Sequence, residues 1–143
     1  MRLDAFAATS GEVETALVAG SPAATSGDCC DLPTLLRRCM DDRELAVMLL
    51  ERFTSRLDTT VRDIGQLLAN SKWEEATSAV HSLKGEAGSL AIERLHTTCT
   101  CLEESLRQGS YEVTANQFEQ VQKSAATCLA GAPAVLERLA QSI

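Results

Sequence analysis

The chain has 143 residues, of which 45% are hydrophobic and only 3% are aromatic. This length is enough for one domain with a modest core. A formal net charge of −7 argues against nucleic acid or an anionic membrane surface as a partner. No stretch is long and apolar enough to span a bilayer, and the N-terminus lacks the pattern of a secretory signal. We therefore expect a cytoplasmic protein.

Residues 1–28 are rich in Ala, Thr, Ser and Gly, and Pro22 interrupts them further. We predict a flexible N-terminal tail or linker over residues 1–28, followed by one helical domain over residues 29–143. A short helix over residues 12–18 would not be stable alone. Whether the tail has a docking role or none is left open.

The first part of the domain contains two signals for a helix start. Asp31 can cap a short helix with Pro33 in its first turn. A capping-box pattern at residues 41–44 then predicts a long helix from about Arg43 to Ala69, in which Gly65 is a weak spot. The apolar positions of this helix step by three and four residues: Leu49, Leu50, Phe53, Leu57, Val61, Ile64 and Leu68.

Three further helices follow at short intervals. A second capping box at residues 71–74 starts a helix that ends near residues 90–91, with Trp73 expected to pack at a helix junction. The next helix runs from about Ile92 to a C-cap at Gly109. Ser110 is expected to cap the last bundle helix, and residues 131–133 to break or kink it before a short final piece over residues 134–143. The expected core stripe of the last bundle helix consists of Val113, Phe118, Val121, Ala125 and Leu129.

The helices and their short connections define the expected fold. Short connections make neighbouring helices antiparallel. We therefore predict an all-α, up-down-up-down four-helix bundle with a short extra N-terminal helix. The six cysteines form no Cys-x-x-Cys pair and are interpreted as small residues without a chemical role: Cys29, Cys30, Cys39, Cys99, Cys101 and Cys128.

The helix that begins near Trp73 carries an unusual polar face. At about 100° per residue, its apolar side faces a core, and the residues roughly 150° away form a second face. That second face consists of Thr77, His81, Lys84, Gly85 and Gly88. Each interior glycine costs a helix about 1 kcal/mol relative to alanine, which suggests that something must approach His81 closely. Close packing against another helix is the alternative, less favoured for Gly85 and equally acceptable for Gly88.

This face suits phosphoryl chemistry. A largely neutral imidazole is a nucleophile at physiological pH, and Lys84 can offset the charge of an anionic group on His81. The second histidine, His96, has no metal-ligand spacing to His81 and is interpreted as an ordinary helix residue. We predict no metal site.

The segment His81-Ser82-Leu83-Lys84-Gly85, within residues 79–90, resembles the signature of the histidine phosphotransfer (HPt) domain family. Residues 99–109 resemble the following family helix, and the similarity covers about residue 31 to the C-terminus. Two positions depart from the family pattern. Ala91 stands where many members have glycine, and Glu86, which faces away from His81, stands where a small residue is usual.

The resemblance implies a phosphocarrier of a two-component phosphorelay. His81 would be phosphorylated on Nε2 and would exchange the group with a receiver-domain aspartate, or take it from a sensor or hybrid histidine kinase. The receiver would supply Mg²⁺ and most catalytic groups, so this chain would need no cofactor of its own. With no ATP-binding motif in the sequence, the chain is expected not to be an enzyme. The expected docking surface is Thr77, Ser78, Ser82, Gly85 and Gly88 around His81, with Lys84 stabilising the phosphoryl charge.

Two alternatives stay open at this point. The bundle can be an interaction module that binds a receiver or kinase and transfers nothing, although the retained His81, Lys84 and Gly85 argue against it. A metal-binding bundle is the weaker alternative, because two histidines without a paired carboxylate motif make a poor ligand set.

Overall fold

The computed structural model describes residues 29–141, so the tail predicted over residues 1–28 lies outside the described residues. Within them, the chain forms only helices and their connections. The elements in order are α1 (Leu32–Arg38), α2 (Arg43–Ala69), α3 (Trp73–Ser89), α4 (Glu93–Gln108), a 3₁₀ turn at Tyr111–Val113, and α5 (Thr114–Gln141). No helix in this part of the chain has the length and hydropathy needed to cross a membrane.

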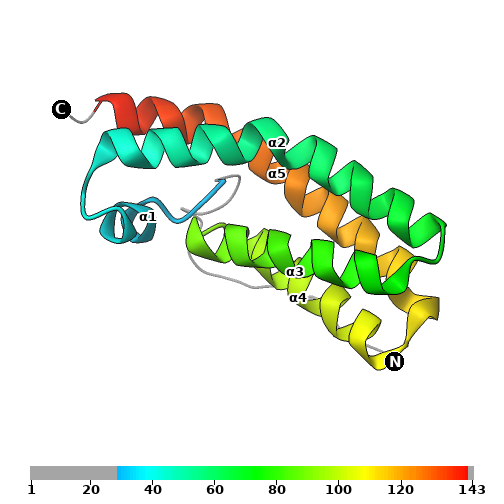
Figure 1. Ribbon diagram of the computed structural model, residues 1–143. Coiled ribbons are helices and arrows are strands. Elements are labelled where there is room, and N and C mark those ends of the chain that lie inside the picture. Colours follow the sequence, from blue (N-terminus) through cyan, green and yellow to red (C-terminus); the bar gives the residue numbers. More distant parts are fainter. Residues whose placement is uncertain (1–28, 142–143) are drawn as a thin grey trace, which may run out of the picture.

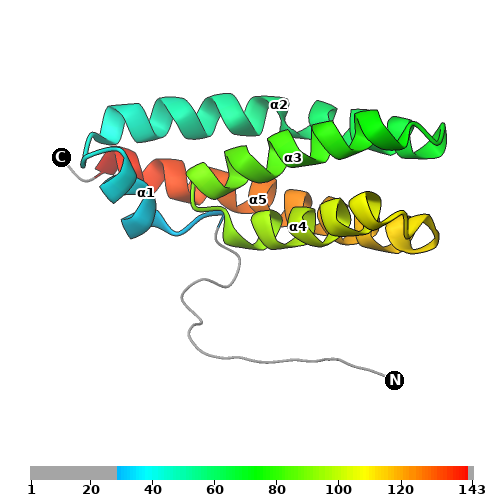
Figure 2. The same ribbon diagram turned by 60° about the horizontal axis from the view of Figure 1, so that its bottom comes forward.

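The four long helices run alternately up and down, as predicted (Figure 1). Helix α3 packs on α4, α2 packs on α5, and the two pairs face each other. The short helix α1 lies at the end of the bundle where α2 begins and α3 ends (Figure 2). A backbone hydrogen bond of 2.9 Å from Asp31 N–H to the Ala91 carbonyl ties the start of α1 to the connection after α3.

Helix starts differ in how they are capped. Asp31 caps α1, and Asp42 caps α2 by accepting a hydrogen bond from the Leu45 N–H at 3.0 Å. The predicted second capping box is wrong: Lys72 is the N-cap of α3 and makes no side-chain capping bond. Ser71 instead has φ +56°, a left-handed conformation that turns the chain before the helix begins. Gly109 caps α4 with φ +76°, as expected.

Helix α5 corrects three predictions. Pro133 lies inside a continuous helix, so the predicted break is wrong. Pro133 is exposed while Ala132 and Val135 are buried, so water can reach the site of the missing hydrogen bond while core packing holds the helix together. Val113 is 38% exposed in the 3₁₀ turn and does not belong to the core stripe. Ser110 precedes that turn and makes no side-chain capping bond.

The core confirms the periodic pattern read from the sequence. Leucine, isoleucine and valine side chains from all four long helices fill it. Five of the six cysteines are buried and Cys101 is exposed, and none of them forms a disulfide. Gly65, the predicted weak spot of α2, allows close packing, because a Cβ there would lie 3.0 Å from the Phe118 ring on α5. Trp73 stacks on Tyr111 with ring centroids 4.2 Å apart, which confirms its expected place at a helix junction.

Candidate functional site

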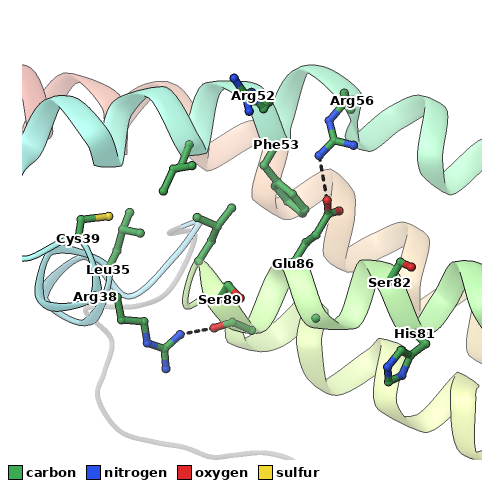
Figure 3. Close-up of a pocket in the computed structure, with 14 residues that line it drawn as sticks. Leu35, Arg38, Cys39, Arg52, Phe53, Arg56, His81, Ser82, Glu86 and Ser89 are labelled. Atoms are coloured by element: carbon green, nitrogen blue, oxygen red, sulfur yellow. Dashed lines mark hydrogen bonds and ion pairs between the residues drawn. The ribbon is translucent and has the colours of Figure 1, made fainter.

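His81 lies in the middle of α3, and its side chain is 60% exposed. Val80, Leu83 and Ala87 on the same helix are buried, which turns the opposite face outward. Figure 3 shows the ring projecting from α3 on the side away from α2. The imidazole is therefore accessible to a partner while its backbone is held rigidly by the core.

The carboxylate of Glu103 on α4 contacts the imidazole of His81. This carboxylate is nearly fully buried, and Oε2 lies 2.8 Å from His81 Nδ1. Lys84 Nζ lies 2.6 Å from the other oxygen, Oε1. Arg107, one turn further along α4, donates to Oε2 from Nη2 at 2.6 Å and from Nε at 3.0 Å. Three basic side chains thus converge on one buried carboxylate.

The protonation state of Glu103 follows from these contacts. Burial by itself raises the pKa of this carboxyl group, but hydrogen bonds from Lys84, Arg107 and His81 outweigh burial and lower the pKa to about 2. Glu103 is therefore ionised at neutral pH and can only accept hydrogen bonds. Near His81 it acts as a fixed negative charge.

An ionised acceptor at Nδ1 determines which ring nitrogen is free. In a neutral imidazole one nitrogen carries hydrogen and the other carries a lone pair. Because Glu103 can only accept, the hydrogen lies on Nδ1 of His81, in the 2.8 Å contact. Nε2 then carries the lone pair and is the nucleophilic atom of the exposed ring.

The structure places the predicted polar face in two different environments. At Gly85 an added Cβ would meet no atom of the described residues within 4 Å, apart from the backbone of its own helix, so the space beside this glycine is open. At Gly88 a Cβ would lie 3.0 Å from the His96 ring on α4, so close helix packing accounts for this glycine. The Thr77 hydroxyl donates to the Trp73 carbonyl at 2.7 Å and is half-buried, whereas Ser78 and Ser82 are exposed.

The ammonium group of Lys84 points at Glu103 and the side chain is only 25% exposed. Its shortest contact is thus to a carboxylate within the protein. The predicted direct contact between Lys84 and a phosphoryl group stays a prediction. The Lys84 ammonium group, 2.6 Å from Oε1, lowers the pKa of Glu103 and so favours its ionised form beside His81.

A groove runs along α3 on one side of His81, between α1, α2 and α3 (Figure 3). Its apolar lining is contributed by Leu35, Leu49, Phe53 and Leu90. Three arginines border it: Arg38, Arg52 and Arg56. Arg38 donates to the Gly88 carbonyl, and Arg56 forms an ion pair of 2.9 Å with Glu86. Glu86, which departs from the family pattern, therefore belongs to this groove.

A second hollow lies on the other side of His81. Thr77, Ser78, Ser82 and Arg107 line it together with His81, and the stacked Trp73 and Tyr111 also contribute to its lining. His81 thus lies between a groove with apolar and cationic walls and a smaller polar hollow. In residues 29–141 no group of three or more His, Cys, Asp or Glu side chains could hold a metal ion.

Glu103 and Arg107 were not predicted as site residues from the sequence, although both lie in the segment 99–109 that resembles the family. A signal for both was present. Glu103 is four residues after Cys99, at the margin of the apolar stripe of its helix, and Arg107 follows after four more. A carboxylate at such a position needs a partner.

The family model for the Hpt domain matches residues 48–142, which contain all of α3, α4 and α5 and most of α2. No curated protein and no solved structure matches the chain.

Proposed function

Because the chain belongs to the histidine phosphotransfer (Hpt) domain family, we propose that His81 carries a phosphoryl group to or from the aspartate of a receiver domain. Hpt domains act in two-component phosphorelays as phosphocarriers rather than enzymes, and they interact with receiver domains and histidine kinases. The observation that carries the assignment is the 2.8 Å contact between His81 Nδ1 and the buried Glu103 carboxylate. His96, by contrast, has its ring against Gly88.

The geometry supports a direct in-line transfer. The lone pair on Nε2 of His81 attacks phosphorus, the new P–N bond forms, and the P–O bond to the receiver aspartate breaks with its electron pair on the aspartate carboxylate. The ring gains positive charge as the bond forms. Glu103, fixed next to the Nδ1–H, stabilises that charge without having to reorganise.

In this proposal the partner completes the catalytic centre. The chain supplies the nucleophile and its buried carboxylate, while the receiver supplies Mg²⁺ and the leaving aspartate. No cofactor bound to this chain is needed, and a cytoplasmic location follows from that of receiver and kinase domains. A sensor kinase and a hybrid kinase are both compatible with the site.

We place the docking surface on the exposed part of α3 and the adjoining groove. Ser78, Ser82 and Gly85 lie around the accessible ring, and the half-buried Leu49 in the groove offers apolar area that a partner can bury. Thr77 and Gly88, the other two predicted docking residues, are half-buried and contact their own helix or α4. Their share in docking is therefore expected to be smaller.

Gly85→Ala separates docking from reactivity. Outside the backbone of α3, the added methyl group meets no atom of residues 29–141, so we expect the helix to gain up to about 1 kcal/mol of stability. Transfer from a receiver should become slower, because the methyl group occupies the clearance beside His81. Labelling by the small donor phosphoramidate should be unchanged. Urea unfolding and both labelling rates check this prediction.

The contrast variant for this prediction is Gly88→Ala. It carries the same change, but its methyl group would lie 3.0 Å from the His96 ring, so we expect lower stability. Equal receiver transfer rates for Gly85→Ala and the wild type would show that Gly85 does not face the partner.

Phosphotransfer from a panel of phosphorylated receiver domains tests the proposed function. Label on the protein should be stable to base, lost in acid, and located by mass spectrometry in the peptide that contains His81. Label on His96 would contradict the assignment. No label from any receiver, kinase or phosphoramidate would favour the interaction module that binds a receiver or kinase without transfer.

A further inference from the structure

Arg107 has no part in the transfer chemistry described above, yet it donates two hydrogen bonds to Glu103. Its Nη2 and Nε lie 2.6 Å and 3.0 Å from Glu103 Oε2, the same oxygen that accepts from His81. We infer that Arg107 is a positioning residue that holds Oε2 against Nδ1 of His81 and thereby sets the tautomer of the phosphoacceptor ring. This inference rests on the proposed function of His81.

Such a residue is needed because the glutamate side chain is flexible. The last torsion of Glu is broad and roughly two-fold, so a carboxylate turns easily unless its partners hold it. Lys84 is a single point donor, and its ion pair with the carboxylate is to Oε1, at 2.6 Å. With Lys84 alone, the carboxylate can swing about that one contact. A second anchor on Oε2 removes this freedom.

Arginine suits the second anchor for geometric reasons. The guanidinium is planar and rigid, so its Nε and Nη2 reach Oε2 as one unit. Arg107 lies four residues after Glu103 on α4, so the pair is held by one helix and does not depend on how α3 packs. His81 on α3 then meets an acceptor whose direction is already determined by α4.

Stability alone does not explain the contact. The Arg107 side chain is 59% exposed although Glu103 is buried, so water screens the guanidinium charge and the pair stabilises the fold less than a fully buried ion pair would. The guanidinium also lines the polar hollow next to His81, Ser78 and Ser82. A measurement on the His81 ring itself therefore distinguishes a positioning role of Arg107 from a merely structural one.

The test is nitrogen NMR of the His81 ring in the ¹⁵N-labelled full chain, combined with phosphoramidate labelling rates. The wild type should show hydrogen on Nδ1. Arg107→Gln should give a mixture of the two tautomers and roughly tenfold slower labelling, equivalent to about 1.4 kcal/mol in the barrier. Arg107→Lys should be intermediate, because one point donor cannot replace the two contacts.

Arg94→Gln is the matched control, because Arg94 is an exposed arginine on the same helix, near its start. It should leave both tautomer and labelling unchanged. An unchanged Nδ1–H tautomer in Arg107→Gln would overturn the inference, and full rescue by Arg107→Lys would overturn the two-donor argument. If the wild type took no label at all, the proposed function would fail, while the NMR measurement would still decide the role of Arg107.

Discussion

A His81→Gln variant is expected to accept no acid-labile phosphoryl label from receivers, kinases or phosphoramidate. The glutamine amide has no nucleophilic lone pair comparable to that of Nε2, so the loss should be complete. The His81 side chain is 60% exposed, and surface substitutions usually change stability by less than about 0.5 kcal/mol. Labelling and urea unfolding of the same preparation therefore separate lost chemistry from lost structure.

The matched control for this variant is His96→Gln, which removes the only other histidine. It loses packing between α4 and Gly88, so we expect lower stability but retained labelling. If His81→Gln took up base-stable, acid-labile label at the wild-type level, the phosphoacceptor would be a residue other than His81.

The Glu103→Ala variant is expected to lose both stability and reactivity. The nearly buried carboxylate compensates Lys84 and Arg107, and removing one partner of a buried ion pair typically costs about 3–5 kcal/mol. Because Lys84 and Arg107 are partly exposed, we expect the lower end, about 3 kcal/mol. His81 loses its acceptor at Nδ1, so phosphoramidate labelling should slow by at least roughly tenfold.

Glu104→Ala is the control, because Glu104 is the exposed neighbour of Glu103 on α4. It should change the free energy of unfolding by less than about 0.5 kcal/mol. Equal losses in the two variants would mean that burial and the three contacts of Glu103 contribute nothing specific.

Acid stability should depend on the same carboxylate. Folding lowers the pKa of Glu103 from its ordinary 4.5 to about 2, because the hydrogen bonds from Lys84, Arg107 and His81 outweigh burial. The unfolded chain therefore binds a proton at higher pH than the folded protein does. The stabilising contribution is complete above about pH 5 and is lost as the pH falls towards 2. A shift of this size corresponds to about 3 kcal/mol.

Urea unfolding at several pH values between 6 and 2.5 measures this contribution. The difference in unfolding free energy between the wild type and Glu103→Ala should shrink as the pH falls. A difference that stays constant over this range would show that Glu103 has the same pKa in the folded and unfolded states.

Local patterns in the sequence were sufficient to predict the helices and the exposure of His81. The predicted long helix from Arg43 to Ala69 has these bounds in the structure. The outward orientation of His81 could also be predicted, because the apolar residues Val80, Leu83 and Ala87 on the same helix had to be buried. Each of these results depends on residues within a few turns of one helix, and helical periodicity relates such residues directly.

Tertiary structure alone decided what surrounds His81. Glu103 lies 22 residues away on another helix, and only the packing of α3 on α4 brings its carboxylate to His81 and Lys84. The same packing places His96 against Gly88, and in α5 the buried neighbours of Pro133 keep the helix continuous. The rotation and register of one helix against the next depend on how all core side chains fit together, and no single helix contains that information.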